Sequence, residues 1–163
     1  MKWITHQTGA VLAAMAMGLP LPGIIATCSG AIMPDVIDQR ISGLSRSKRA
    51  RQKLFNSIHR GSSHWFGWWL GLFLAPLFWP MPLLPRDMLA GFALGALTHI
   101  GMDMLTPKGV PPGPFASMGR IALPICSTGK ISEWIFFGAM LLVGCLFLHG
   151  QIAPALASLQ KYF

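Results

Sequence analysis

The residues best suited to chemistry in this chain are histidines and aspartates that border its apolar segments. Ionisable side chains at such positions are costly and usually functional. His99 and Asp103 are four residues apart, so on a helix both side chains share one face. An imidazole and a carboxylate one turn apart can bind the same metal ion. Taken alone, the pair is more often a hydrogen bond inside a helical bundle.

Three further groups of these residue types lie upstream. The longest, at 57–64, holds two histidines five residues apart around Arg60. A pair of acids follows the first apolar run, and one histidine precedes that run. Each group also has a simpler interpretation. The segment 57–64 can be a polar loop, the pair of acids can mark the end of a helix, and the first histidine can be an interfacial imidazole. The residues concerned are His59, His64, Asp35, Asp38 and His6.

The composition restricts the class of protein in which these residues act. Of 163 residues, 53% are hydrophobic and 11% are charged, with a formal net charge of +8. Soluble domains have about 25% charged residues, so this chain has too few to cover a water-exposed surface. It is too apolar for a disordered protein, and its many Trp, Phe and Met residues disfavour a soluble nucleic-acid binder. We therefore expect an integral membrane protein.

We expect an all-α fold, a polytopic membrane helical bundle in which residues 1–163 form a single integral membrane domain. Prolines interrupt apolar runs that approach the roughly 20 residues of a membrane span. This pattern predicts two proline-broken helical hairpins and a further C-terminal transmembrane helix. The expected parts are a broken hairpin at 8–33, a basic cytoplasmic loop at 39–60, a helical hairpin at 64–105, a Pro/Gly-rich loop at 106–130, a transmembrane helix at 131–149 and a tail at 150–163.

The proline corners decide whether the candidate residues can meet. One straight helix over the first run would separate His6 from Asp35 by about 43 Å, at 1.5 Å per residue. A reversal at 20–23 instead brings both residues to the same end of a hairpin, and its prolines also disfavour cleavage of this run as a signal peptide. A second corner at 80–82 returns the third run towards His64. The candidate residues then gather at one membrane face, which favours a metal site.

The basic segment 39–60 contains seven of the 13 Lys and Arg residues and no acid. The positive-inside rule places it in the cytoplasm. It can also bind the anionic head groups of membrane lipids, although topology alone explains the charges equally well. Attraction to nucleic-acid phosphates is a weaker, non-specific alternative, so we expect no specific nucleic-acid partner. Glycines spaced by four, at 67/71 and 91/95, suit internal packing and a homo-oligomer equally.

At these motifs the sequence resembles the YdjM-like family of bacterial inner-membrane, metal-dependent hydrolases. The likeness rests on the order of the motifs over residues 5–109, with Asp38 one place later than in the family's usual Pro-Asp-x-Asp form. It implies a multi-pass protein of the bacterial inner (cytoplasmic) membrane. The matching segments are Thr5-His6, Pro34-Asp35-Val36-Ile37-Asp38, His59-Arg60-Gly61-Ser62-Ser63-His64, Gly95 to Asp103 and Thr106-Pro107-Lys108-Gly109.

The order of histidines and aspartates is also similar to that of the zinc-dependent phospholipase C and S1/P1 nuclease families. Those are helical enzymes in which a multi-zinc cluster cleaves phosphodiesters. This chain lacks their second set of ligands, because only Glu133 and His149 remain as candidates after Asp103. We therefore expect one or two metal ions and not three.

The candidate ligands offer nitrogen and oxygen without thiolates, which suits Zn²⁺, with Mn²⁺ or Fe²⁺ as alternatives. Asp35 is also a candidate for orienting or deprotonating the attacking water. Arg60 is a candidate for holding a phosphate or carboxylate, although a simple topology charge explains it equally well. The expected metal ligands are His6, Asp35, His59, His64, His99 and Asp103.

Three functions remain open from the sequence. The first is a membrane-bound hydrolase in which metal-activated water attacks a phosphodiester or ester bond of a lipid or lipid-linked substrate at the cytoplasmic interface. The second is a non-enzymatic membrane anchor or scaffold with a structural or vestigial metal site. A transporter is least favoured, because the acids do not line a path across the bilayer. An open coordination position favours the first function, and a closed four-ligand shell favours the second.

Overall fold

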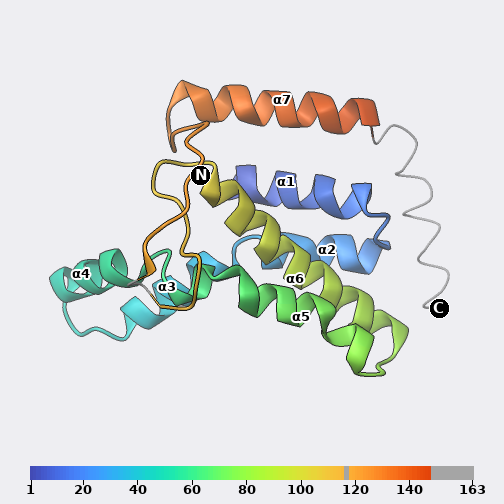
Figure 1. Cartoon of the computed structure of the whole chain (residues 1–163), viewed down its shortest axis with the longest axis horizontal. Helices are drawn as coiled ribbons and strands as arrows, with labels where there is room; N and C mark the ends of the chain where they lie inside the picture. The colour runs from blue at the N-terminus through green and yellow to red at the C-terminus, as the bar shows by residue number, and fades with distance from the viewer. Residues whose placement is uncertain (116–117, 148–163) are drawn as a thin grey trace.

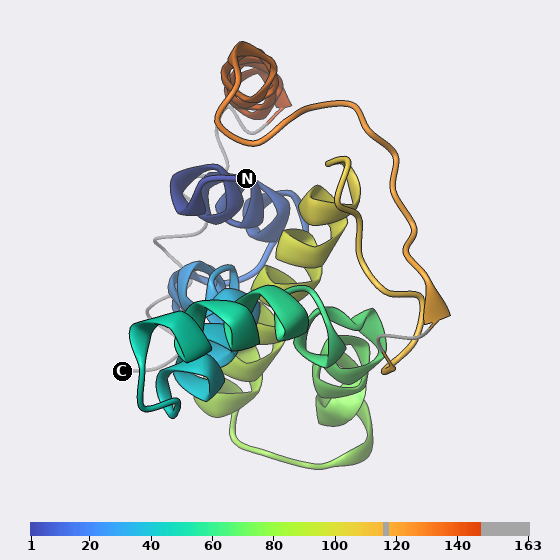
Figure 2. The ribbon, with the colours of Figure 1, turned by 90° about the vertical axis from the view of Figure 1, so that its left-hand side faces the viewer.

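The computed structural model describes residues 1–115 and 118–147, and within this part the chain is helical apart from loops and one isolated β-bridge. The expected all-α fold is confirmed. Helix α6 crosses the centre and packs against α1, α2 and α5 (Figures 1 and 2). The elements are α1 (Trp3–Ala16), α2 (Leu21–Gly30), α3 (Met33–Gly43), α4 (Lys48–Ile58), the short 3-10 helix η1 (Ser62–His64), α5 (Phe66–Phe78), α6 (Leu83–Met104) and α7 (Ile131–Phe147).

Glycine and proline break the first apolar run, as the sequence predicts. Helix α1 ends at Ala16, Gly18 adopts a φ of 68° and Pro20 directly precedes α2. Glycine tolerates this left-handed conformation because it has no Cβ, and proline suits the start of a helix because it lacks an N–H group. Helices α1 and α2 pack against each other, so the start of α1 and the end of α2 lie at the same end of the molecule (Figure 1).

A second corner joins α5 to α6. Helix α5 ends at Phe78 and α6 begins at Leu83, with Pro80 and Pro82 in the connection. The prolines remove backbone donors and prevent one continuous helix. Helix α6 therefore runs back to the side of the molecule at which α5 begins (Figure 1). There His99 of α6 lies close to His64 of η1.

The basic segment 39–60 differs from the loop that its charge suggests, because most of it is helical. Its first residues complete α3, and residues 48–58 form α4, which projects from the molecule beside α3 (Figure 1). The Ser47 hydroxyl caps α4 by accepting a hydrogen bond from the Ala50 N–H at 3.1 Å. Leu54 and Ile58 are four residues apart and so lie on the same face of α4. This apolar face supports an amphipathic helix despite the many charged residues.

Helices α2 and α6 approach to backbone contact. A Cβ added to Gly30 would lie 1.8 Å from the Phe92 carbonyl oxygen, and one added to Gly95 would lie 2.2 Å from the Thr27 carbonyl oxygen. Small residues permit such close approach. The Gly91/Gly95 spacing therefore serves packing within the chain.

Residues 105–115 and 118–130 are largely irregular, as the proline and glycine content of this stretch predicts. An antiparallel bridge joins Val110 to Ile121, and the Leu123 N–H donates to the Met104 carbonyl at 2.7 Å. These bonds tie the connection to the end of α6. Helix α7 then runs beside α1 (Figure 1).

The expected membrane-spanning helices are not found. Among the helices that the structure describes, none is both long enough and apolar enough to cross a membrane. Prolines limit α1, α2 and α5 to 14, 10 and 13 residues, against about 20 for a span. The multi-pass arrangement, including the transmembrane helix expected at 131–149, is therefore not supported. His149 and the tail at 150–163 lie outside the described residues.

Candidate metal centre

His99 and Asp103 lie on one face of α6 near its C-terminal end, and both side chains are almost completely buried. His99 Nε2 is 3.6 Å from Asp103 Oδ2. A normal hydrogen bond spans about 2.7–3.2 Å, so a direct hydrogen bond does not account for the pair.

Two residues from other elements complete a group that we name the central cluster: Asp35, His64, His99 and Asp103. His64 Nε2, from η1, is 3.3 Å from His99 Nε2 and 3.7 Å from Asp103 Oδ2. Asp35 Oδ1, from α3, is 3.4 Å from His64 Nε2 and 3.7 Å from His99 Nε2. Two ligands about 2.1 Å from one tetrahedral ion lie about 3.4 Å apart, so these separations suit a shared ion.

Neighbouring groups orient the two imidazoles of the central cluster. His99 Nδ1 lies 2.6 Å from the Ala31 carbonyl oxygen, which can only accept a hydrogen bond. Nδ1 therefore donates this hydrogen bond, and Nε2 faces the cluster. His64 Nδ1 is 3.0 Å from Ser63 Oγ and 3.5 Å from Asp38 Oδ2. Metal-binding histidines are typically held in this way through their second ring nitrogen.

The protonation states of the central cluster also suit metal binding. Burial would raise the pKa of Asp35, but contact with His64 and the nearby His99 outweighs burial and holds this pKa well below its ordinary value. Burial lowers the pKa of His64, against the opposing contact with Asp35. Near neutral pH the carboxylate is ionised and the imidazole is neutral, which are the forms that bind metal ions.

His6 and His59 lie at the edge of the central cluster. The ring of His6 stacks on His99 with centroids 3.9 Å apart, and His6 Nε2 is 3.5 Å from Asp103 Oδ1. His59 Nδ1 is 3.6 Å from Asp35 Oδ1. The structure thus brings all six predicted ligands together. Three overlapping triads have ligand atoms within 4.8 Å of one another: His6, His99 and Asp103; Asp35, His64 and His99; and Asp38, His59 and His64.

Two buried atoms of this group, Asp35 Oδ1 and His6 Nδ1, have no hydrogen-bond partner within the described part of the chain. Asp35 Oδ1 is surrounded by three imidazole nitrogens at 3.4–3.7 Å, too far for good hydrogen bonds. An unsatisfied buried polar atom costs about 1–3 kcal/mol. A divalent cation accepts electron pairs from both oxygen and nitrogen, so the residues present fit such an ion.

Arg60 supports the central cluster from a strained backbone position. Its φ is 59°, a conformation that costs a non-glycine residue about 1–3 kcal/mol. The buried guanidinium donates to Asp103 Oδ1 and to Thr106 Oγ1, each at 2.7 Å. The sequence made Arg60 a candidate for holding a phosphate or a carboxylate, and in the structure its guanidinium holds the Asp103 carboxylate.

Asp38, whose role the motif leaves open, anchors the segment that carries two of the histidines. Its carboxylate accepts hydrogen bonds from the Ser63 hydroxyl at 2.6 Å and from the Arg60 backbone N–H at 3.2 Å. Asp35 and Asp38 are three residues apart on α3 and so share a face. The Asp35 carboxylate belongs to the central cluster. The Asp38 carboxylate holds the segment that links α4 to η1 through its bonds to Arg60 and Ser63.

Glu133 is a buried residue of the site region to which the sequence pattern assigned no role. Its carboxylate accepts hydrogen bonds from the Lys2 backbone N–H, from the Thr5 hydroxyl at 3.1 Å and from the Gly129 N–H at 2.6 Å. These contacts fix the start of α1, which carries His6. The sequence feature that could have indicated a role for Glu133 is that it is the only acidic residue after Asp103.

A cavity of about 330 Å³ opens onto the central cluster. Asp35 and Asp103 line it together with Lys108. A neighbouring depression of about 600 Å³ shares Lys108 and also includes Arg120. The approach to the cluster is therefore cationic and suits an anionic ligand.

The described part of the chain is thus an all-helical protein in which buried histidines and carboxylates form a candidate metal centre. A family model described as YdjM inner membrane protein matches residues 1–159, so the chain belongs to this family of bacterial inner membrane proteins, which confirms the resemblance carried by the motifs. The inner membrane protein YdjM of Escherichia coli (strain K12) is 35% identical over 97 residues, and that of Shigella flexneri matches to the same extent. The aligned segment covers 56% of this chain and 46% of each relative, so it spans under half of their length. No solved structure matches.

Proposed function

We propose that this chain is a metal-dependent hydrolase of the bacterial inner membrane that cleaves a phosphodiester or ester bond. The observation that carries the proposal is the central cluster, in which ligand atoms from α3, η1 and α6 lie 3.3–3.7 Å from their neighbours. This mixed set suits Zn²⁺, with Mn²⁺ or Fe²⁺ as alternatives. His6 and His59 extend the set, so it has room for one or two ions.

In the proposed hydrolysis, Asp35 and Lys108 have different roles. A divalent ion held by the central cluster would act as a Lewis acid and would lower the pKa of a bound water molecule towards about 7. Asp35 is the most accessible member of the cluster, with 14% of its side chain exposed against at most 2% for the others, so it can orient or deprotonate a water molecule entering from the cavity. Lys108, at the cavity, is placed to stabilise the charge of a phosphate.

A lipid or lipid-linked substrate at the cytoplasmic interface fits this proposal best. The support is the inner-membrane family of the chain and the cationic approach formed by Lys108 and Arg120. Phosphate esters carry negative charge and these side chains carry positive charge, so the two attract each other.

The burial of the cluster supports a second candidate function. His6, His64 and His99 are at most 1% exposed, which is typical of a closed, structural site. The chain would then be a non-enzymatic membrane anchor or scaffold whose metal ion stabilises the fold.

Hydrolysis assays on the purified chain distinguish the two functions. Protein stripped by a chelator and reloaded with Zn²⁺, Mn²⁺ or Fe²⁺ is given bis(p-nitrophenyl) phosphate and, separately, p-nitrophenyl butyrate. Asp35→Asn should lower turnover by at least about 100-fold, because proton transfer contributes that much. The control Asp87→Asn makes the same change near the opposite end of α6 and should leave turnover unchanged. Stoichiometric metal without turnover of either probe would contradict the hydrolase and select the structural function.

A further inference from the structure

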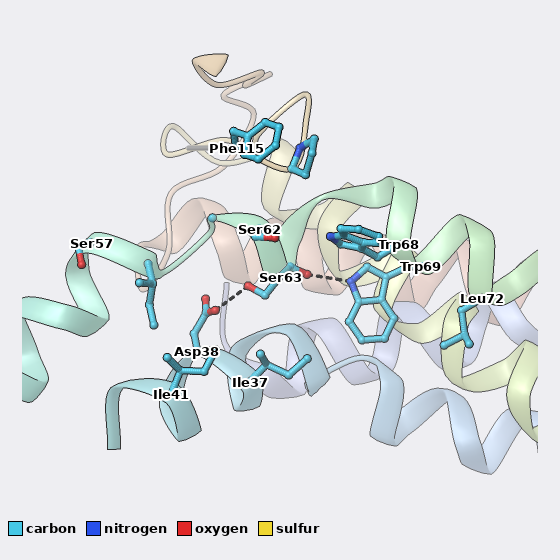
Figure 3. Close-up of a pocket in the computed structure, with 13 residues that line it drawn as sticks. Ile37, Asp38, Ile41, Ser57, Ser62, Ser63, Trp68, Trp69, Leu72 and Phe115 are labelled. Carbon is cyan, nitrogen blue, oxygen red and sulfur yellow. Dashed lines mark hydrogen bonds between the residues drawn. The ribbon is translucent and has the colours of Figure 1, made fainter. Parts of the chain in front are cut away.

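A groove of about 690 Å³ lies between α3, α4 and α5 and extends to Phe115 (Figure 3). Its volume is within the range of about 300–1,000 Å³ that is usual for small-molecule sites. No member of the central cluster lines it, but Asp38, which contacts His59 and His64, does, so the groove adjoins the candidate metal centre without opening onto the central cluster. Its apolar walls include Ile37, Ile41, Ile58, Trp68, Trp69 and Leu72.

Several polar groups of this groove, on Asp38, Ser57, Ser63 and Trp69, are already bonded to the protein. The Ser63 hydroxyl donates to Asp38 at 2.6 Å, and Trp69 Nε1 donates to the Ser63 carbonyl at 2.8 Å (Figure 3). The Ser57 hydroxyl donates to the Leu54 carbonyl at 2.7 Å. A ligand that relied on hydrogen bonds would have to break these contacts, whereas a hydrocarbon chain would leave them intact.

Large apolar side chains at the groove remain open to solvent. The exposed fractions are 46% for Ile41, 58% for Trp68 and 64% for Phe115. Contiguous apolar surface of this kind marks binding sites, because covering it removes an unfavourable contact with water. The groove therefore favours an apolar occupant.

The charge of α4 identifies the kind of occupant. This helix contributes Ser57 and Ile58 to the groove. Four of its 11 residues are Lys or Arg, none is acidic, and all four basic side chains are exposed. A basic amphipathic helix beside an apolar surface is typical of sites for anionic lipids, in which the head group meets the cations and the chain meets the apolar surface.

We propose that the groove between α3, α4 and α5 binds a hydrocarbon chain of an anionic phospholipid, and that α4 holds its head group. Membership of an inner-membrane family places such lipids next to the protein. The lipid site uses none of the four residues of the central cluster, although Asp38 borders both, so its occupancy can be tested apart from that of the metal centre.

Photolabelling of the purified full chain in detergent micelles tests this site. The probe is phosphatidylglycerol with a diazirine in its acyl chain, and mass spectrometry maps the labelled residues. We expect label on Trp68, Leu72 and Phe115. Ile41→Glu should lower it by at least about tenfold, because an apolar site disfavours a carboxylate. The matched control is Ile25→Glu on α2, where the isoleucine is 60% exposed and outside the groove, and it should label like the unaltered chain.

A second lipid probe and a second variant complete the photolabelling experiment. Phosphatidylcholine with the same photoactive chain should label the groove less, and equal labelling would contradict the role of α4. Label spread evenly over exposed apolar residues, or unchanged in Ile41→Glu, would overturn the site. If Ile41→Glu lowers the melting temperature, Trp68→Ser replaces it as the test variant, with the same expected loss. Metal content measured on the same samples should not change, which separates a failure of this site from a failure of the metal centre.

Discussion

At the scale of single residues, Arg60 positions a ligand of the candidate metal centre, because its side chain holds the Asp103 carboxylate. Its guanidinium binds both Asp103 and Thr106, and a lysine cannot reproduce two such bonds from one rigid group. We predict that Arg60→Lys weakens zinc affinity about 10–100-fold, as loss of a group that orients a ligand does. Competition with a chromophoric chelator measures this affinity. Arg40→Lys, at an exposed position of α3, is the control. Unchanged affinity in Arg60→Lys would contradict the positioning role.

Asp35 and His64 predict how the stability of the metal-free protein depends on pH. Burial lowers the pKa of His64 below its ordinary 6.5, whereas the pKa of Asp35 lies below its ordinary 3.8 because contact with His64 outweighs burial. For each group the unfolded chain takes up its proton at a higher pH than the folded chain. Stability is therefore lost as pH falls, first below about 6.5 through His64 and then below about 3.8 through Asp35.

Thermal unfolding of chelator-treated protein between about pH 7.5 and pH 5 checks the His64 contribution. The melting temperature should fall on acidification, and the fall should be smaller in His64→Gln. A melting temperature that rises on acidification would contradict the assigned protonation states.

The ligand residues follow from the sequence more readily than their supporting groups do. His99 and Asp103 share a helical face by spacing alone, and the proline corners were enough to bring His6 and Asp35 together. The role of Arg60 was not predictable, because it depends on a positive φ that turns its side chain towards Asp103. Side-chain direction in an irregular segment is set by packing and leaves no periodic pattern.

At the scale of elements, two glycines of α6 provide a matched pair. A Cβ at Gly95 would meet the backbone of α2, whereas a Cβ at Gly101 would meet nothing within 4 Å. We predict that Gly95→Ala destabilises the fold by about 1–3 kcal/mol through overpacking. Gly101→Ala should instead stabilise it, by up to about 1 kcal/mol of helix propensity. Denaturant unfolding of both variants in the same detergent measures the difference. Equal stability of the two variants would contradict the close contact of α2 with α6.

The elements also show where a sequence pattern is misleading. The corners at 20–23 and 80–82 were predictable, because proline and glycine act on the local backbone. The helical nature of 48–58 was not predicted, because its charge pointed to a loop while the Ser47 cap and the apolar spacing favoured a helix. Local capping therefore outweighed composition in α4.

At the scale of the whole molecule, the fold gathers the ends of several helices at one place. The start of α1, the start of α3, η1 and the end of α6 all contribute to the candidate metal centre. Composition predicted a membrane protein, in agreement with the family, but it also predicted long spanning helices that the described residues do not contain. In α1, α2 and α5 the apolar residues lie on short helices, because the prolines that bring the ligands together also limit helix length.

The metal content of the purified protein tests the central claim most directly. Elemental analysis after dialysis should find one or two equivalents of a divalent transition metal, such as zinc, per chain. His99→Ala and Asp103→Ala should each lose most of this metal, because each removes a ligand of the central cluster. Asp87→Asn, on the same helix, should keep it. Equal metal content in all four proteins, or none in the unaltered chain even after zinc is supplied, would contradict the account.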